Sequence, residues 1–194
     1  RNCMFSRFCF ISLFCFLFSV VAAGNSYHFS VDLTKVKDDQ LKVILDAPDI
    51  NVDEIIYFLP KIVPGTYEIY DFGRFVNDFK VYDKAGVEMP YEHFGLNRWR
   101  IKNAKNIKKI SYMVEDTWDT EIKEAFVFEP AGTNFEAGKN FVINTHGVFG
   151  YFDGMKNLEY HVDITRPSNF YGSTSLMNVT TKNNTDSYTI PDYM

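Results

Sequence analysis

Two stretches near the start of the chain decide its fold. They are Tyr27-His-Phe-Ser-Val-Asp-Leu, at residues 27–33, and Gln40-Leu-Lys-Val-Ile-Leu-Asp-Ala, at residues 40–47. Apolar and polar side chains alternate strictly in the first stretch, and this period of two is typical of a strand with one buried face. Asp38 and Asp39 lie between the two stretches and indicate a turn. We predict that they form a β-hairpin.

Similar patterns recur along the rest of the chain. They predict strands at residues 54–59, 75–83, 97–102, 109–115, 139–144 and 158–165, with Phe75, Phe79 and Val81 on the core face of the second of these. Helical periodicity is nearly absent, and residues 118–126 offer room for one helical turn at most. The composition is 17% aromatic, which suits pleated surfaces. We therefore predict an all-β fold, a single antiparallel β-sandwich domain.

The first residues follow a different pattern. Residues 5–23 are almost wholly apolar, with Arg7 as the single charge, and the run ends in Ala22-Ala-Gly. A short apolar run that closes on small residues is typical of a cleaved signal peptide, whereas a membrane span is usually longer and flanked by charge. We predict a signal peptide at residues 1–24, with Met4 as initiator and residues 1–3 as translated upstream sequence. No stable membrane span is expected after cleavage.

The cysteines support an exported protein of a particular kind. Cys3, Cys9 and Cys15 all lie within the predicted leader, so the mature chain has no disulfide and depends on its core alone. This usage favours a periplasmic, cell-surface or secreted bacterial protein. We predict that residues 25–180 form the β domain and that residues 181–194 are a polar connection toward a further domain, because the chain stops without a polar terminus.

The charge of the chain argues against nucleic acid as a partner. The formal net charge is −5, and it becomes more negative when Arg1 and Arg7 are removed with the leader. The basic stretch at residues 102–109 alternates with Asn, Ala and Ile, which is typical of a solvated turn between strands.

The sequence lacks the motifs of common catalytic centres. His28, His93, His146 and His161 are followed by Phe, Phe, Gly and Val, so the His-Glu-x-x-His motif of zinc peptidases is absent. There is no Gly-x-Ser-x-Gly motif, and the carboxylates are scattered over turns and polar strand faces. We predict no catalytic residue, metal ligand or cofactor in this chain.

Two aromatic segments stand out. Residues 59–79 contain Pro64-Gly65, which predicts a type II turn, followed by the aromatic series Tyr67, Tyr70, Phe72 and Phe75. A packed sandwich corner and a binding surface are both compatible with this series. Residues 144–155 form a glycine-rich aromatic loop, compatible with an ordinary bend or with one wall of a ligand groove.

From the second segment we take three residues, His146, Phe149 and Tyr151, as the candidates that line a substrate site.

These segments, in this order, resemble the N-terminal domain of the glycyl aminopeptidase family of zinc metallopeptidases. The resemblance spans residues 27–194 and centres on Leu59-Pro-Lys-Ile-Val-Pro-Gly-Thr-Tyr-Glu-Ile, followed by Asp71-Phe-Gly-Arg-Phe-Val and Val81-Tyr-Asp-Lys-Ala-Gly. Ile62 and Thr66 depart from the family pattern, where tryptophan and serine are usual. Both changes are conservative for packing.

The resemblance implies a non-catalytic β domain that precedes a thermolysin-like catalytic domain. The zinc site and the His-Glu-x-x-His motif of the family lie in that catalytic domain, so no metal ligand transfers to this chain. The implied partners are the chain's own C-terminal catalytic domain and a peptide substrate. Two alternatives remain: a stand-alone exported module that binds carbohydrate or peptide through exposed aromatics, and a purely structural surface domain.

Overall fold

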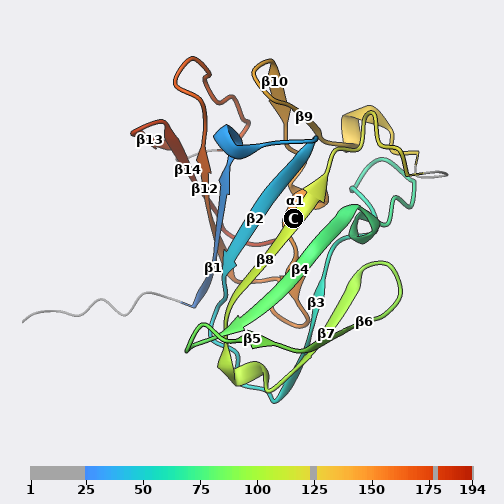
Figure 1. Cartoon of the computed structure of the whole chain (residues 1–194), viewed down its shortest axis with the longest axis vertical. Helices are drawn as coiled ribbons and strands as arrows, with labels where there is room; N and C mark the ends of the chain where they lie inside the picture. The colour runs from blue at the N-terminus through green and yellow to red at the C-terminus, as the bar shows by residue number, and fades with distance from the viewer. Residues whose placement is uncertain (1–24, 123–125, 177–178, 194) are drawn as a thin grey trace, which may run out of the picture.

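The computed structural model describes residues 25–122, 126–176 and 179–193, and these residues are almost entirely β (Figure 1). The first strands are β1 (Ser26–Asp32), β2 (Gln40–Asp46), β3 (Glu54–Phe58), β4 (Val76–Asp83), β5 (Glu88–Met89), β6 (Tyr91–His93) and β7 (Arg98–Lys102). The later strands are β8 (Ile107–Glu115), β9 (Asn134–Glu136), β10 (Asn140–Val142), β11 (Tyr151–Phe152), β12 (Glu159–Thr165), β13 (Thr180–Lys182) and β14 (Thr185–Ile190). The described helices are a single α-turn, α1 (Thr145–Val148), and the 3-10 turns η1 (Leu33–Lys35), η2 (Phe72–Phe75), η3 (Ala104–Asn106) and η4 (Glu129–Ala131).

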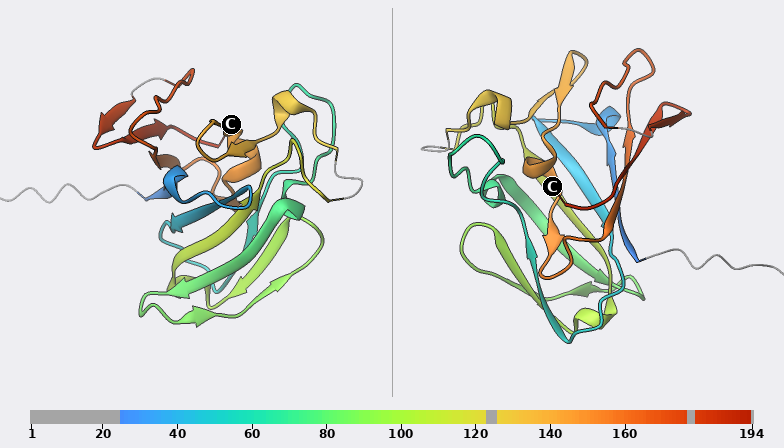
Figure 2. Two further views of the ribbon diagram at one scale, coloured as in Figure 1. Left: turned by 45° about the horizontal axis from the view of Figure 1, so that its top comes forward. Right: turned by 180° about the vertical axis from the view of Figure 1, so that it is seen from behind.

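The strands form one large sheet and one smaller sheet. The eight-stranded sheet has the order β13-β14-β12-β1-β2-β8-β4-β5, and the four-stranded sheet has the order β11-β3-β7-β6. Strands β9 and β10 form a separate two-stranded ribbon. Figure 2 shows the sheets from two further directions.

The two sheets face one another across an aromatic core. Tyr57 on β3 lies 6.1 Å from Tyr112 on β8, and Phe79 on β4 stacks on Trp99 of β7 with 4.7 Å between ring centroids. The hydroxyls of Tyr57 and Tyr112 also bond to each other at 3.1 Å. Each of these rings is on the inward side of its strand, because alternate side chains point to opposite faces. The predicted all-β sandwich is confirmed.

The predicted hairpin is confirmed, and it continues into a parallel pair. Strand β1 pairs antiparallel with β2, with Phe29 opposite Leu45. On its other side β1 runs parallel to β12, with Phe29 opposite Val162. The chain therefore joins one of its first strands to one of its last in the middle of the large sheet.

Two local predictions need correction. Phe75 is buried, but it belongs to the 3-10 turn η2 and to a second, smaller core, while Phe79 and Val81 face the main core from β4. No helical turn occurs at residues 118–122 or at residue 126, and residues 123–125 lie outside the described part. The chain is held there by Asp116, whose carboxylate accepts hydrogen bonds from the backbone N–H groups of Trp118, at 2.6 Å, and of Phe135.

The segment that we expected as a polar connection carries regular structure. Strand β14 pairs with β12 along six residue pairs, and β13 folds back on β14. The hairpin turn is made by Asn183 and Asn184, both with positive φ, a conformation that asparagine tolerates. Residues 180–190 are thus part of the sheet, and a further domain after them stays a prediction.

The predicted signal peptide, residues 1–24, lies outside the described residues. Within the described ranges, no helix has the length and apolar character needed to cross a membrane.

Candidate functional site

The two aromatic segments of the sequence lie side by side in the structure. Strand β11, from the glycine-rich loop, pairs antiparallel with β3, which leads into the Pro-Gly segment. Tyr151 lies opposite Phe58 and stacks on it, with 5.5 Å between centroids and 15° between planes. The pairing brings the end of β3 next to α1, and a cleft opens between them.

The Pro-Gly segment is a closed loop, and we call residues 61–71 the Pro-Gly loop. The Lys61 carbonyl accepts hydrogen bonds from the backbone N–H groups of Tyr70, at 2.7 Å, and Asp71, at 3.0 Å, which joins the two ends. The predicted type II turn is present at its far end, where Thr66 N–H donates to the Val63 carbonyl and Gly65 has φ of +88°.

A second core supports the Pro-Gly loop from below. It consists of five buried residues, which are Tyr70, Phe72, Phe75, Val127 and Ala131. Asn97, itself buried, fixes the loop to β7 by accepting from Gly73 N–H at 2.8 Å and donating to Asp71 Oδ1 at 2.6 Å. Three of the four aromatics in the series therefore pack a corner of the sandwich. The fourth, Tyr67, is fully exposed with φ of +58°.

The cleft beside the loop, which we call the Lys156 cleft, has a volume of about 380 Å³. Its lining consists of Phe58, Leu59, Pro60, Lys61, Ile62, Pro64, Asn97, His146, Tyr151, Lys156 and Tyr193. Aromatic rings form its floor, since Tyr193 lies 4.8 Å from Tyr151 and meets the ring of His146 edge-on at 5.5 Å. The Tyr193 hydroxyl is anchored by donating to the Phe149 carbonyl at 2.8 Å.

The three candidate residues divide between two cavities. His146, on α1, and Tyr151, at the start of β11, both line the Lys156 cleft. Phe149 points the other way, is buried, and packs against Phe29 of β1 at 4.9 Å. The reason is local: α1 is a single turn and the chain is extended after it, so residues 146 and 149 leave the backbone on different sides.

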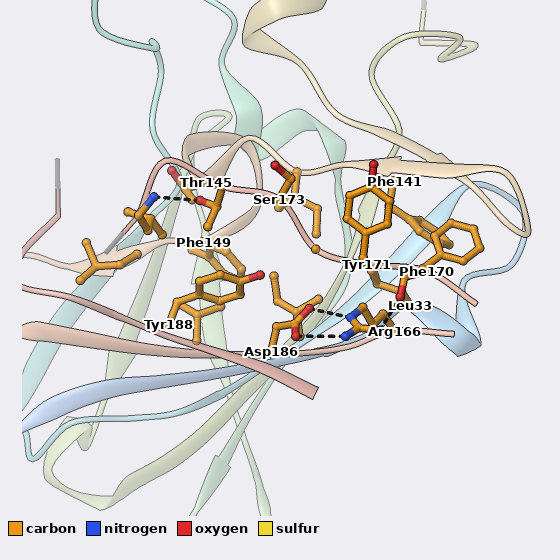
Figure 3. Close-up of a pocket in the computed structure, with 17 residues that line it drawn as sticks. Leu33, Phe141, Thr145, Phe149, Arg166, Phe170, Tyr171, Ser173, Asp186 and Tyr188 are labelled. Carbon is orange, nitrogen blue, oxygen red and sulfur yellow. Dashed lines mark hydrogen bonds and ion pairs between the residues drawn. The ribbon is translucent and has the colours of Figure 1, made fainter. Parts of the chain in front are cut away.

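Phe149 borders a second cavity of about 190 Å³ between the large sheet and the loop at residues 166–176 (Figure 3). Arg166 and Asp186 face each other at one side of this cavity and form an ion pair at 2.7 Å. The remaining walls are mostly apolar and include Phe141, Phe170 and Tyr188. The Arg166 guanidinium also donates to the Phe170 carbonyl, which secures the loop over the cavity.

The buried tyrosines near both cavities are hydrogen-bond donors and not bases. Burial raises the pKa of Tyr27 to about 12, and burial likewise raises the pKa values of Tyr112 and Tyr193. Their protons are directed at backbone groups or at other tyrosines, as in the 2.8 Å bond from Tyr112 to the Val148 carbonyl. These phenols stay neutral at physiological pH and position the chain around α1.

The residues that line the Lys156 cleft are of kinds that can bind a ligand. In the described ranges no group of three or more His, Cys, Asp or Glu side chains could hold a metal ion. The Lys156 cleft offers ammonium groups, an imidazole and aromatic faces, and these recognise ligands by charge and stacking.

Sequence reasoning missed four of the eleven residues that line the cleft, which are Phe58, Asn97, Lys156 and Tyr193. Lys156 follows β11 and a turn, and Tyr193 lies in the segment that was expected to be a connection. Neither residue carries a local pattern that distinguishes it. Phe58 lies just before the segment that we had singled out, and Lys61 lies within it. Pro60, which ends the strand between them, is the one signal that could have placed them at a sheet edge.

Comparisons with known proteins agree with the fold. The family model described as the peptidase M61 N-terminal domain matches residues 28–194. Among solved structures, an aminopeptidase N family protein from Idiomarina loihiensis is similar with a TM-score of 0.65 at 18% identity, over 86% of this chain and 27% of that one. A mutant of an M1 zinc metallopeptidase from Deinococcus radiodurans gives a TM-score of 0.41 at 10% identity, over 85% of this chain and 37% of that one. A search of curated proteins gives no match.

The chain thus spans 27% of the length of the Idiomarina protein and 37% of the length of the Deinococcus protein. The family match covers the Pro-Gly loop, the glycine-rich loop and both cavities, and it confirms the resemblance inferred from the sequence. The chain belongs to the peptidase M61 N-terminal domain family.

Proposed function

We propose that this chain is the non-catalytic N-terminal β domain of an exported zinc metallo-aminopeptidase-like protein. In this role it supports a catalytic domain that follows it and lines one side of the peptide groove with the Lys156 cleft. In this proposal the zinc ion belongs to that catalytic domain, as the family resemblance implies.

One observation carries the proposal: an apolar face is exposed where two loops pack together. The Pro-Gly loop presents Ile62, Tyr67 and Ile69, and the neighbouring loop presents Phe126 and Phe128, all between 49% and 101% exposed. Val63 and Val127 of the same loops pack on the second core, so the two loops are joined beneath this face. Figure 1 shows them adjacent at one end of the sandwich. Exposed apolar side chains gathered on neighbouring loops are typical of a protein-interaction surface.

Tyr67 has the properties of an anchor residue at such an interface. Its backbone is held in the left-handed region, which costs free energy for a tyrosine and is usually retained for a functional reason. The loop beneath it is closed by hydrogen bonds, which hold the backbone that carries the exposed ring. Exposed tyrosines on rigid loops are frequent energetic centres of interfaces.

The proposed occupant of this face is the catalytic domain of the same polypeptide. The similar Idiomarina chain is much longer than this domain, since the match covers only 27% of it. A weak apolar contact is sufficient for docking between two domains of one chain, because the covalent link makes their effective concentration high.

The test compares Tyr67→Asn and Phe126→Ser in the full-length protein with the wild type. Asparagine accepts the left-handed backbone, so the loop stays intact. We expect the double variant to unfold in two separate transitions where the wild type unfolds in one, and to lose most of its aminopeptidase activity. Tyr171→Asn, an equally exposed tyrosine on a different loop, is the control and should change neither property.

Unchanged unfolding and unchanged activity in the double variant would refute docking at this face. The domain assignment has its own test, which is the coding sequence beyond residue 194. We expect a His-Glu-x-x-His motif within the next domain, and a stop codon there would favour a stand-alone module. Mass spectrometry of the mature protein tests export, with an N-terminus expected at residue 24 or 25.

A further inference from the structure

The Lys156 cleft combines positive charge with an aromatic floor. The Lys156 ammonium lies 4.3 Å from the centre of the Tyr151 ring and 6.0 Å from that of Tyr193. Lys61 reaches the same cleft from the base of the Pro-Gly loop. The two cationic side chains therefore come from segments far apart in sequence and face one cavity.

No carboxylate neutralises this charge within the described lining of the cleft, whose residues include neither Asp nor Glu. Five other lysines of the described part form ion pairs, among them Lys35–Asp32 at 2.7 Å, Lys80–Asp78 at 2.8 Å and Lys105–Asp53 at 2.9 Å. The chain as a whole carries a net charge of −5. A cationic cleft in an acidic domain attracts anions to that position.

The walls of the cleft are apolar, so they favour an anionic group that is attached to an apolar side chain. Phe58, Tyr151 and Tyr193 offer ring faces, and Leu59, Pro60, Ile62 and Pro64 add aliphatic surface. A volume of about 380 Å³ accommodates a side chain of aromatic size together with the adjoining backbone.

We infer that the Lys156 cleft binds the C-terminal carboxylate of a peptide whose last side chain is apolar. Lys61 and Lys156 contact the carboxylate, and the side chain lies on the Phe58–Tyr151–Tyr193 surface. The inference deepens the proposed function and rests on it for the source of the peptide. It implies that the parent enzyme prefers short peptides with a free C-terminus. In such a peptide the N-terminal residue lies at the cleavage site while the C-terminal residue lies in the Lys156 cleft.

The direct test titrates the full-length protein with Gly-Gly-Phe, with its C-terminal amide, and with acetate, and follows binding by calorimetry in a low-salt buffer. We expect the free acid to bind about ten-fold more tightly than the amide, since the charge-assisted contacts are lost in the amide. Acetate should bind more weakly than the tripeptide because it lacks the apolar body. Raising the salt concentration should weaken binding of the acid and not of the amide.

Three lysine variants locate the binding. Lys156→Met and Lys61→Met keep the apolar stem and remove the charge, and each should weaken binding of the acid about three-fold, as suits solvent-exposed contacts. Lys42→Met, at an exposed position of β2 remote from the cleft, should leave the affinity unchanged. Equal affinity of acid and amide, or equal effects of all three variants, would overturn the inference. Acetate binding as tight as tripeptide binding would also overturn it, because the site would then be a general anion site.

Failure of this inference is distinguishable from failure of the proposed function. The docking variants Tyr67→Asn and Phe126→Ser alter residues outside the lining of the cleft. If docking fails and the lysine variants still weaken binding, the cleft is a peptide-binding site of a module without a catalytic partner. If docking holds and the lysine variants have no effect, the domain supports the enzyme without reading the peptide's C-terminus.

Discussion

At the scale of single residues, the Arg166–Asp186 pair determines the shape of the smaller cavity. Arg166 follows β12 directly, and Asp186 lies in β14, so the ion pair joins neighbouring strands at the root of the loop at residues 166–176. Asp186 also accepts from Thr181 Oγ1 at 2.6 Å. These contacts, the Arg166 bond first, lower the pKa of the Asp186 carboxyl although burial opposes them.

We predict that Asp186→Asn destabilises the domain. The Asp186 side chain is 4% exposed and that of Arg166 is 14% exposed, so removal of the negative charge leaves a largely enclosed guanidinium without its partner. The expected decrease in the midpoint of thermal unfolding at pH 7 is roughly 5 °C. Asp163→Asn is the control, because this exposed carboxylate on β12 accepts a single bond from Ser187. The prediction would be contradicted if Asp163→Asn lowered the midpoint of thermal unfolding as much as Asp186→Asn does.

The same pair makes stability depend on pH in a defined direction. A carboxyl group whose pKa is lower in the folded state stabilises the protein above its unfolded pKa of about 3.9, and this contribution is lost as the pH falls through the folded value. The difference in stability between wild type and Asp186→Asn should therefore be constant near neutral pH and should shrink below about pH 4. Calorimetry at several pH values measures it.

At the scale of elements, the pairing of β11 with β3 depends on Gly150. A Cβ at this position would lie 2.4 Å from the Phe58 carbonyl oxygen and 2.6 Å from the Tyr57 ring. The Gly150 N–H also donates to the Tyr57 hydroxyl at 3.2 Å. The glycine is required because two backbones approach closely. The sequence had suggested a different reason, which was the flexibility of a glycine-rich loop.

We predict that Gly150→Ala costs about 3 kcal/mol in the free energy of unfolding, because the Phe58 backbone and the buried Tyr57 cannot both move away. Gly147→Ala is the matched control. Its Cβ would meet only side-chain atoms, at 3.3 Å or more, and alanine favours the α1 turn. The control should cost less than about 1 kcal/mol, and urea unfolding distinguishes the two. A Gly150→Ala protein as stable as the wild type would show that β11 can shift on β3.

Most of the longer strands could be predicted from sequence to within a few residues, because alternation marks buried faces directly. The six-residue strand β14 was missed, because its buried face carries the charged residue Asp186. The segment at residues 27–33 became β1 at Ser26–Asp32, and the segment at residues 109–115 lies within β8. Strands β11 and β13 could not be predicted, since two or three residues carry no period. Alternation shows which face of a strand is buried, but it does not show which strand lies beside it. The parallel pairing of β1 with β12 therefore left no signal in the sequence.

At the scale of the whole molecule, the Lys156 cleft could be predicted only in part for the same reason. His146 and Tyr151 were found because their loop is unusual in composition. Lys61, Lys156 and Tyr193 come from three other places along the chain and meet only when the sheets assemble. Local sequence patterns do not show which residues from distant parts of the chain come together in the folded domain.

The C-terminal hairpin of β13 and β14 closes one edge of the large sheet, and its removal is our prediction at this scale. A chain of residues 25–179 would expose the whole edge of β12, a seven-residue strand with unpaired backbone groups. We expect it to aggregate in size-exclusion chromatography at concentrations where the chain of residues 25–194 is monodisperse. A chain of residues 25–190 is the control, because it keeps β14 and loses only the Tyr193 contacts. A monodisperse protein ending at residue 179 would contradict the assigned role of the hairpin.

The parallel pairing of β1 with β12 also orders events during synthesis. Strand β1 leaves the ribosome early, yet its neighbour at Glu159–Thr165 appears only after most of the domain has been translated. At roughly 5–20 residues per second this interval is on the order of 10 s. Throughout it, the centre of the large sheet cannot close, and the nascent polypeptide stays open to chaperones. The topology thus delays completion of the fold until almost the entire domain has been made.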